Sequence, residues 1–385
     1  MGRPAHLVTS RPILLHGELR DPDLRALVLG RSAQLRPALL RGYSVKAAAP
    51  GGFAVAVPDD GAVAEGLLVD APAPEDIARL DWYAASLGQE RRGADADVDG
   101  ERLAVDIHAP AEGARAPAGA WRLDAWRARH GARALLAVPG VMALRGSVAP
   151  ERAAHLRTVI EGRAAARLRA AEEPAPAVHR SALGADEVTV RGSEDRHLGF
   201  FELRELELSH PRFDGTRSPW LRREVFCAGD AVIVLPYDPV RDRILLVEQF
   251  RMGPFARGAR RPWMLEPVAG FVDAAEAPAD AARREAREEA GLALGPLLTI
   301  ASYYPSPGAS TEFFHSYLAL CDLPDLEERC GGLASEHEDI RLHLLTFSEA
   351  MELIRSGEAD VGPLITALLW LERERPRLRA EAGAG

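Results

Sequence analysis

Residues 270–292 read GFVDAAEAPADAARREAREEAGL. Glycine, glutamate and arginine recur in this stretch at fixed spacings, in the pattern G-x5-E-x7-R-E-U-x-E-E-x-G-U, where U is an apolar residue. At ordinary residue frequencies, the chance of this pattern at any one start position is on the order of one in ten million or less. The spacing is therefore the most specific feature of the chain.

The second half of the stretch predicts a helix. Residues 279–290 are rich in Ala, Arg and Glu, which are strong helix formers. Pro278 suits a helix start, and Gly291 is a natural helix stop. On a helix, residues three and four apart share a face, so the carboxylates of Glu285, Glu288 and Glu289 can approach one another, and Arg284 can pair with Glu288.

Clustered carboxylates repel one another unless a cation lies between them. Hard oxygen ligands of this kind suit Mg²⁺ or Mn²⁺. Such an ion can neutralise phosphates and lower the pKa of an attacking water. The alternative is a solvated helix with Arg/Glu pairs, and the register of Gly270, Glu276 and Gly291 with the glutamates argues against it.

This motif resembles the Nudix box, the signature of enzymes that hydrolyse a nucleoside diphosphate linked to another group. The resemblance implies an α+β fold, an α/β/α sandwich with a mixed sheet. It also implies that Mg²⁺, with Mn²⁺ as a possible substitute, is the cofactor.

Composition sets the broad class of the protein. The chain has 385 residues, 47% of them hydrophobic and 27% charged, as expected for a globular protein with an ample core. Its net charge of −10 argues against a nucleic-acid partner. No apolar run is long enough to span a membrane. Three cysteines without metal spacing predict free thiols, and the N-terminus shows no apolar signal segment, so we expect a cytoplasmic protein.

The pattern along the chain predicts three parts. Residues 11–145 alternate short apolar runs, helical patterns and turns, residues 146–185 form a helical linker ending in a Pro- and Glu-rich segment, and residues 186–379 form a second α+β domain. Predicted strands in the first part are 12–16, 42–46, 53–57 and 65–69, and predicted helices are 21–29, 74–83 and 120–130. In the last part, strands 231–237 and 243–250 read as a hairpin.

Residues 186–379 are similar to one Nudix subfamily, the ADP-ribose pyrophosphatases. The similarity rests on residues 199–201 (GFF), 222–226 (RREVF), 247–251 (VEQFR), 265–270 (LEPVAG), 304–308 (YPSPG) and 336–340 (EHEDI). Pro307 lies sixteen residues beyond Gly291, where the subfamily carries its marker proline. The resemblance implies hydrolysis of ADP-ribose to AMP and ribose 5-phosphate.

The resemblance also implies roles for individual residues. The carbonyl of Ala269 and the carboxylates of Glu285 and Glu289 would bind the metal, with Glu288 supporting them. Glu336 would be the general base, and Glu338 would be the alternative. Residues assigned to substrate binding are Arg251 for a phosphate, Phe200 and Arg223 for stacking on adenine, and Pro307. Subfamily members are usually homodimers, so Phe200 and Arg223 would then serve a neighbouring subunit.

Residues 11–145 resemble the γ-glutamylcyclotransferase-like fold, a small β-barrel with helices. The residues concerned are 14–19 (LLHGEL), 42–43, 65–68 and 80–83 (LDWY). In this family a Tyr-Gly-x-Leu turn binds the glutamyl end of the substrate, and a glutamate follows the Asp-x-Tyr motif. Here the tyrosine is His16 and the glutamate position is Ala84. Without that carboxylate the cyclisation lacks its general acid/base, so we predict that cyclotransferase activity is lost. Glu18 or Glu90 could substitute, and nothing in the sequence favours either.

A chain with both parts is similar to the bacterial Nudix proteins named for tellurite resistance, which hints at a role in stress. Three functions stay open on the sequence alone. They are an ADP-ribose hydrolase, a hydrolase of another nucleotide sugar or dinucleotide such as GDP-mannose, and a sensor that binds ADP-ribose without turnover.

Overall fold

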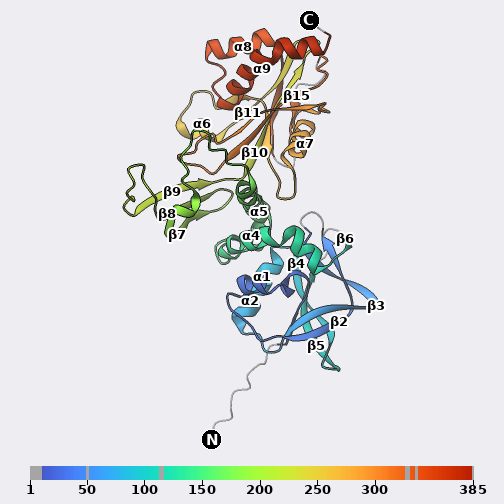
Figure 1. Ribbon diagram of the computed structural model, residues 1–385. Coiled ribbons are helices and arrows are strands. Elements are labelled where there is room, and N and C mark those ends of the chain that lie inside the picture. Colours follow the sequence, from blue (N-terminus) through green and yellow to red (C-terminus); the bar gives the residue numbers. More distant parts are fainter. Residues whose placement is uncertain (1–10, 49–51, 112–116, 326–329, 334–336, 384–385) are drawn as a thin grey trace. The chain divides into compact units, whose positions relative to one another are not determined.

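The computed structural model describes residues 11–48, 52–111, 117–325, 330–333 and 337–383. Packing divides the chain into two compact units (Figure 1). Unit 1 comprises Met1–Val178 with Leu198–Phe200, and unit 2 comprises His179–His197 with Phe201–Gly385. The domain boundaries at 145/146 and 185/186 stay predictions.

Unit 1 combines a strand ring with a helical layer. Its strands are β1 (Ile13–Leu15), β2 (Arg36–Ala48), β3 (Ala54–Val69), β4 (Gln89–Val98), β5 (Glu101–Pro110) and β6 (Pro117–Ala120). Its helical segments are the 3-10 turn η1 (Gly17–Arg20), α1 (Pro22–Leu29), α2 (Pro74–Ala85), α3 (Leu123–Trp126), the π-helical η2 (Arg127–Gly131), α4 (Ala132–Ala143) and α5 (Pro150–Glu172).

The strand order of unit 1 is β3-β1-β5-β4-β2-β6, and β2 also pairs with β3. A closed ring of strand pairings therefore runs through β1, β5, β4, β2 and β3, because β3 pairs with both β1 and β2. Alternate residues of a strand face opposite sides, so Leu14 packs among the strands while Ile13 and Leu15 pack against the helices. The prediction of a barrel goes further than these pairings and stays a prediction.

Several local predictions for unit 1 are corrected. The strands predicted at 53–57 and 65–69 are one strand, β3, and the strand predicted at 42–46 is part of the longer β2. The helix predicted at 120–130 starts later, because β6 extends to Ala120. The β4–β5 hairpin was missed, although Asp99-Gly100, both with positive φ, is a strong hairpin signal.

The described residues of unit 2 form two sheets. Its strands are β7 (Thr189–Leu198), β8 (Glu202–Ser209), β9 (Leu221–Cys227), β10 (Asp230–Asp238), β11 (Arg243–Phe250), β12 (Trp263–Glu266), β13 (Val268–Phe271), β14 (Leu297–Tyr303), β15 (Phe313–Leu320), β16 (Cys330–Gly331) and β17 (Ile340–Thr346). Its helices are the short η3 (Ala185–Glu187), α6 (Met252–Arg257), α7 (Pro278–Ala290), α8 (Phe347–Ser356) and α9 (Gly362–Glu381). The first of these strands begins at Thr189, shortly after η3 ends at Glu187.

The large sheet of unit 2 has helices on both faces (Figure 1). Its strand order is β14-β15-β10-β11-β17-β16, with β12 beside β11 and β13 beside β10. Leu245 and Val247 of β11 pack in the core that contains α7, whereas Ile244 and Leu246 pack in the core that contains α8 and α9. The pairing of β10 with β15 is parallel and that with β11 is antiparallel, so the sheet is mixed as predicted.

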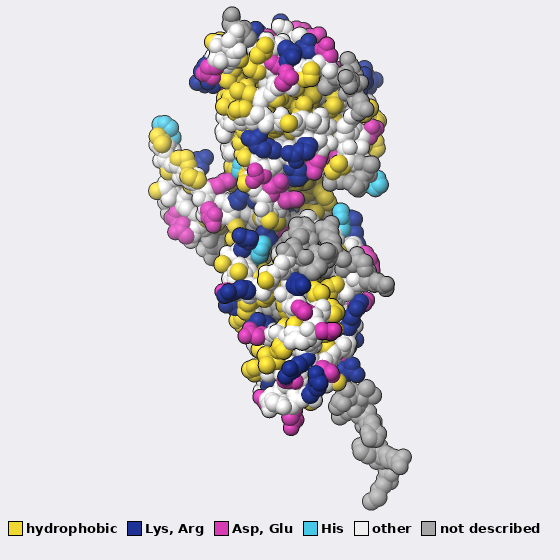
Figure 2. Space-filling view, turned by 90° about the vertical axis from the view of Figure 1, so that its right-hand side faces the viewer, with side chains coloured by type: hydrophobic (Ala, Val, Ile, Leu, Met, Phe, Trp, Pro, Cys, Tyr) yellow, Lys and Arg dark blue, Asp and Glu magenta, His cyan; other side chains and the backbone are white. Residues whose placement is uncertain are grey.

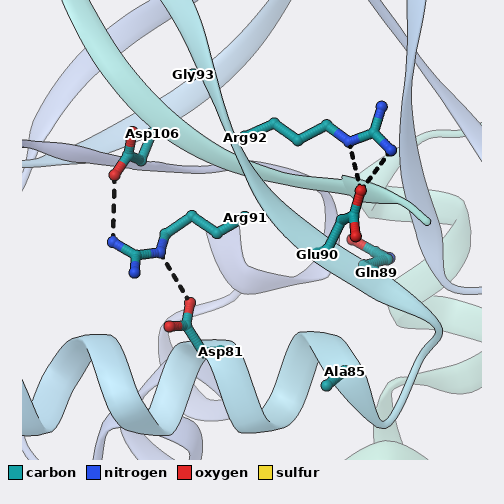
Figure 3. Close-up of a pocket in the computed structure, with 8 residues that line it drawn as sticks. All are labelled: Asp81, Ala85, Gln89, Glu90, Arg91, Arg92, Gly93 and Asp106. Atoms are coloured by element: carbon teal, nitrogen blue, oxygen red, sulfur yellow. Dashed lines mark hydrogen bonds and ion pairs between the residues drawn. The ribbon is translucent and has the colours of Figure 1, made fainter. Parts of the chain in front are cut away.

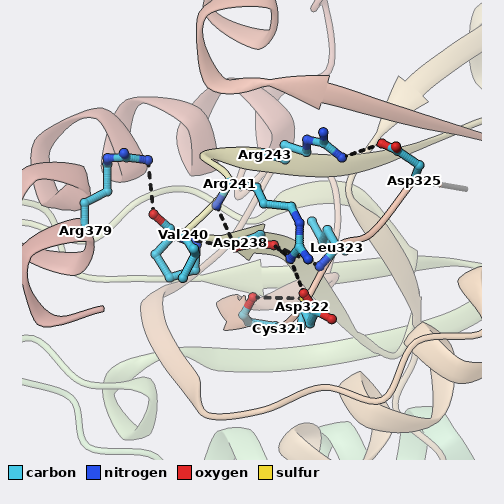
Figure 4. Close-up of polar contacts among 11 residues, drawn as sticks. Asp238, Val240, Arg241, Arg243, Cys321, Asp322, Leu323, Asp325 and Arg379 are labelled. Atoms are coloured by element: carbon cyan, nitrogen blue, oxygen red, sulfur yellow. Dashed lines mark hydrogen bonds and ion pairs between the residues drawn. The ribbon is translucent and has the colours of Figure 1, made fainter. Parts of the chain in front are cut away.

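The predicted hairpin between β10 and β11 is present, and Asp238 stabilises its turn (Figure 4). The Asp238 carboxylate accepts hydrogen bonds from the backbone N–H groups of Val240 and Arg241 at 2.9 and 3.0 Å. It also accepts one from the N–H of Leu323 at 3.1 Å, and the Arg241 guanidinium pairs with Asp322. The turn is thus tied to the segment that follows β15.

Arginine side chains lie among acidic ones on the face shown in Figure 2. Many arginines of the described residues form ion pairs, such as Arg31 with Asp76 and Arg375 with Asp242. Cys227, Cys321 and Cys330 are free thiols, as predicted. Among the described residues, no helix is long and apolar enough to cross a membrane.

Candidate active site

The helix predicted from the motif is α7, which begins at Pro278 and ends before Gly291 in the left-handed conformation (φ 65°). Ala281, Ala282 and Ala286 are fully buried against the large sheet. Their small side chains let α7 approach the sheet closely, which explains why an alanine occupies the first apolar position after Arg284-Glu285.

Arg284 organises the acidic residues of the motif. Its guanidinium donates hydrogen bonds to Glu276 at 3.0 Å, to Glu285 at 2.7 Å and to Glu288 at 3.0 Å. It also donates to the backbone carbonyl of Phe271 at 3.0 Å. The predicted Arg284–Glu288 pair is therefore present. The bond to Glu276 explains the distant glutamate of the motif, a role that the sequence did not assign.

Glu285 and Glu289 lie against β13. The carboxylate of Glu285 touches Gly270 so closely that a Cβ at position 270 would overlap it. Glu289 is only 2% exposed, and its Oε2 accepts a hydrogen bond from the N–H of Ala269 at 3.2 Å. The structure thus brings together Ala269, Gly270, Glu285 and Glu289.

The surroundings of Glu285 and Glu289 oppose ionisation of both carboxyl groups. Burial raises the pKa of Glu285 to about 7, although Arg284 lowers it in part. Burial also raises the pKa of Glu289 to about 8, against the opposing hydrogen bond from Ala269. The negative charge of Glu338 raises the pKa of both groups.

A divalent cation fits this chemistry, because it would offset the cost of burying two carboxylates and would accept oxygen ligands. Within the described residues, no three His, Cys, Asp or Glu side chains are grouped as a ready-made metal site. The described residues therefore suit a cation that is bound by two carboxylates, with a backbone oxygen and water as further ligands. Mg²⁺ is usually bound in this way.

The segment around β16 covers the end of α7. A Cβ at Gly331 would overlap the backbone carbonyl of Glu289, so β16 passes directly beside the helix end. Glu338 folds back on its own loop, where its Oε2 accepts a hydrogen bond from the N–H of Leu333 at 3.1 Å. Glu336, the predicted general base, lies outside the described residues.

Arg251 lies at the end of β11 and pairs with Glu266, with 2.6 Å between Nε and Oε2. Its positive charge lowers the pKa of Glu289, which places Arg251 within electrostatic reach of the carboxylates. Burial raises the pKa of Glu266 in spite of this partner. Glu266 was not among the predicted site residues, because its contact with Arg251 depends on the pairing of β11 with β12.

The residues assigned to adenine lie on different segments. Phe200 lies in the turn between β7 and β8, within unit 1, and is 40% exposed. Arg223 lies on β9 of unit 2, where its guanidinium donates to the carbonyl of Arg222 at 2.8 Å. The stacking of adenine between Phe200 and Arg223 stays a prediction.

The loop that carries Pro307 is joined to β9. The N–H of Phe226 donates to the carbonyl of Ala309 at 2.8 Å, and the N–H of Thr311 donates to the carbonyl of Phe226 at 3.0 Å. The ring of Phe226 also packs against Phe201, with 4.6 Å between ring centroids. This half-exposed aromatic pair beside the Pro307 loop was not among the predicted site residues.

Two family models match the chain. The NUDIX domain model matches residues 228–367, and the model described as gamma-glutamyl cyclotransferase, AIG2-like, matches residues 13–123. The first match includes the whole motif at 270–292, and the second includes the turn at His16 and position 84.

Curated relatives match the C-terminal half of the chain. The ADP-ribose pyrophosphatase of Escherichia coli (strain K12) is 36% identical over 200 residues, which are 51% of this chain and 94% of that protein. The ADP-ribose pyrophosphatase of Haemophilus influenzae is 34% identical over 195 residues, which are 50% of this chain and 89% of that protein. The GDP-mannose pyrophosphatase of Salmonella paratyphi B is 35% identical over 151 residues, which are 39% of this chain and 78% of that protein.

The carboxylates on α7, their contacts with β13 and a similarity that spans nearly the full length of the E. coli relative agree with one another. The chain therefore belongs to the Nudix family, with its C-terminal half related to the ADP-ribose pyrophosphatases and a γ-glutamyl cyclotransferase, AIG2-like domain preceding it.

Proposed function

We propose that the chain hydrolyses the pyrophosphate of ADP-ribose to AMP and ribose 5-phosphate, with Mg²⁺ as its cofactor and Mn²⁺ as a possible substitute. The observation that carries the proposal is the placement of two carboxylates, the partly buried Glu285 and the buried Glu289, against Gly270 and Ala269. A sensor that only binds its ligand has no need for carboxylates that are so costly to bury.

Each group in the site has a role in this proposal. Glu285, Glu289 and the carbonyl of Ala269 would hold the cation, and Glu288 would keep Arg284 in position. Bound Mg²⁺ would neutralise phosphate charge and acidify the attacking water. Arg251 would hold a phosphate by charge-assisted hydrogen bonds, and Glu336 or Glu338 would accept the proton of the water.

The choice of ADP-ribose rests on the relatives named ADP-ribose pyrophosphatase, which match over more of their length than the GDP-mannose pyrophosphatase does. Phe200 and Arg223 are proposed to stack on adenine, and Pro307 to shape the loop beside Phe226. GDP-mannose is the second candidate, because the Salmonella GDP-mannose pyrophosphatase is 35% identical to this chain over 151 residues.

The test is product analysis with ADP-ribose, ADP-glucose, GDP-mannose, NADH and a diadenosine polyphosphate in the presence of Mg²⁺. We expect ADP-ribose to be preferred, with AMP as the product. Glu289→Gln should lower kcat by about a hundredfold or more, whereas Glu352→Gln on the exposed surface of α8 should leave it unchanged. Turnover of GDP-mannose alone would refute the adenine assignments, and binding of ADP-ribose without any turnover would favour a sensor.

We also propose a homodimer in the cytoplasm, on the basis of the subfamily resemblance and the free cysteines. Light scattering on the purified chain tests the dimer, which a monomeric mass would exclude. The link to tellurite stress is proposed on resemblance alone, and tellurite sensitivity of a deletion strain tests it.

A further inference from the structure

Four large apolar side chains of unit 2 are exposed close together around α6. Phe250 is 41% exposed, Phe255 57% and Trp263 56%. The ring centroid of Phe250 lies 5.6 Å from that of Phe255 and 5.4 Å from that of Trp263. Met252, which is 64% exposed, lies three residues before Phe255 on α6 and therefore shares its face. These four residues form the aromatic patch, and contiguous apolar surface of this kind typically marks an interaction site.

The connection between β11 and β12 presents the aromatic patch. Phe250 and Trp263 lie directly opposite each other in the antiparallel pairing of these two strands. α6 follows β11 after one residue, and Gly258 ends it in the left-handed conformation with a φ of +86°. Glycine adopts this conformation without strain, so the chain turns back to β12 at once. The short helix thereby holds Phe255 beside Phe250.

Three arginines, Arg257, Arg260 and Arg261, lie in the same connection and are exposed. Residues 252–265 contain no Asp or Glu, although the whole chain has a net charge of −10. Within the part of the chain that the structure describes, none of the three guanidinium groups has an ion-pair or hydrogen-bond partner. The aromatic patch is therefore accompanied by a local excess of uncompensated positive charge.

This excess contrasts with the arginines of other segments, many of which have acidic partners. Figure 3 shows such an arrangement in unit 1, where Arg91 lies between Asp81 and Asp106, at 3.3 Å from each. Arginines paired in this way offer little charge to a partner. The unpaired arginines beside the aromatic patch are available to an anionic one.

The aromatic patch lies on the side of the large sheet away from α7. Val247 of β11 packs in the core that contains α7, and alternate residues of a strand face opposite sides. Phe250, three residues further on, therefore faces the other side, as does Trp263 opposite it. By the same alternation, Arg251 and Glu266 face the side of α7. A partner on the aromatic patch would thus leave the proposed hydrolase site free.

Charge and ring geometry select between partners. A second copy docked patch to patch across a two-fold axis would bring both sets of unpaired arginines together, which like-charge repulsion disfavours. A single-stranded nucleic acid would need ring faces that are free for stacking. Here the three rings pack against one another, at interplanar angles of 55° and 69°. Clustered aromatic rings next to basic side chains instead suit the interface of a lipid bilayer.

We propose that the aromatic patch, together with Arg257, Arg260 and Arg261, binds the surface of an anionic lipid bilayer. The rings would enter the boundary between headgroups and acyl chains, where aromatic side chains are favoured. The guanidinium groups would donate charge-assisted hydrogen bonds to lipid phosphates, with their apolar stems lying along the rings. Binding of this kind is peripheral, reversible and sensitive to salt.

The experiment is flotation of the full chain with vesicles of phosphatidylcholine and phosphatidylglycerol. Vesicles of phosphatidylcholine alone offer the same bilayer without the negative charge. We expect partitioning onto the anionic vesicles to be stronger by roughly tenfold or more, and to weaken as salt is added, because salt screens the arginines. Equal partitioning onto both kinds of vesicle, or onto neither, would overturn the proposal.

Phe255→Ser tests the contribution of the aromatic patch. The serine keeps a small side chain on α6 and removes the ring, so partitioning onto the anionic vesicles should weaken by roughly tenfold. Phe213→Ser is the matched control, because Phe213 is 91% exposed elsewhere in unit 2, and it should partition as the wild-type chain does.

A double variant, Arg260→Gln with Arg261→Gln, tests the contribution of charge. It should weaken partitioning onto the anionic vesicles by roughly tenfold or more, with little effect on neutral ones. Its control is Arg355→Gln with Arg373→Gln, which removes two arginines that are 72% and 84% exposed on α8 and α9. Circular dichroism verifies that each variant is folded, so the test does not depend on the proposed hydrolase activity.

Three further results would overturn the proposal. Normal partitioning of either folded patch variant would place lipid binding on another surface. A monomeric mass for Phe255→Ser beside a dimeric mass for the wild-type chain, measured by light scattering, would make the aromatic patch an interface between copies. Tighter binding of a single-stranded oligouridylate than of the anionic vesicles would make it a nucleic-acid surface.

Discussion

Gly270 lies directly against the carboxylate of Glu285, with no space for a methyl group between them. The glycine of the motif is thus required by the position of a side chain fifteen residues further along the chain. Its role is to let β13 and the carboxylate of Glu285 approach each other.

Gly270→Ala should displace the carboxylate of Glu285 while leaving the fold intact, because Gly270 has no positive φ. A misplacement on the order of 1 Å in an active site costs roughly a hundredfold in rate. We therefore expect kcat for ADP-ribose to fall by about a hundredfold, measured by AMP release. Gly253→Ala, at a position where a Cβ meets no other atom, is the control. A Gly270→Ala enzyme with normal kcat would show that Glu285 is free to move.

Arg284→Lys tests whether the glutamates around Arg284 need only its positive charge or also the geometry of its guanidinium group. Lysine keeps the positive charge but cannot make the several directed hydrogen bonds of a guanidinium. Loss of a group that orients metal ligands typically costs 10- to 100-fold in metal affinity or activity. We expect the Mg²⁺ concentration for half-maximal activity to rise about tenfold. Arg283→Lys, whose guanidinium contacts the carbonyls of Leu294 and Gly295 instead, should change it little.

Glu266→Gln should disturb Arg251 without removing it, so Glu266 acts as a positioning residue. We expect KM for ADP-ribose to rise about tenfold with a smaller change in kcat, because Arg251 is proposed to hold a phosphate in both the ground state and the transition state. In a double-mutant cycle with Arg251→Ala, the two effects should be strongly non-additive. Additive effects would mean that Glu266 does not act through Arg251.

Asp242 should make the packing of α9 depend on pH. Its carboxylate accepts hydrogen bonds from Tyr237 at 2.9 Å and from Arg375 at 2.8 Å. Burial raises its pKa, but these hydrogen bonds outweigh burial, so the pKa in the folded state lies below the ordinary value. The stabilisation is therefore complete above the unfolded-state pKa of about 3.9 and is lost as the pH falls through the lower folded-state pKa.

Asp242→Asn keeps a residue that tolerates the positive φ of 59° at this position. We expect the variant to lower the free energy of opening of α9 by about 2 kcal/mol at pH 7, with a smaller difference below pH 4. Hydrogen exchange of peptides from residues 362–381 measures this quantity. A difference that does not change with pH would mean that the charge of Asp242 is not responsible.

The sequence predicted the parts of the site that depend on local spacing. The bounds of α7 and the Arg284–Glu288 pair follow from helix periodicity and terminal residues, and both are present. The contact of Glu266 with Arg251 could not be predicted, because it depends on which residue of β12 lies beside the end of β11. Sequence spacing carries no information about such contacts unless the strand pairing is known.

The same limit applies to unit 1. The substitution at Ala84 was visible in the sequence, but the choice between Glu18 and Glu90 was not. Glu18 and Ala84 line one small cavity of unit 1, beside a turn in which Gly17 packs on Ala54 of β3, thirty-seven residues later in the chain. The β4–β5 hairpin, in contrast, has a local sequence signal in Asp99-Gly100, so it could have been predicted.

The alanine face of α7 has a consequence for how this enzyme tolerates change. The methyl groups of Ala281, Ala282 and Ala286 act as spacers, and their size determines how far the carboxylates of α7 stand from β13. A larger side chain at any of them would move Glu285, Glu288 and Glu289 away from β13 together, since protein interiors do not absorb added volume. Three residues without any functional group thus determine where the carboxylates of α7 lie. A screen for inactive variants should therefore recover substitutions of these alanines as well as of the glutamates.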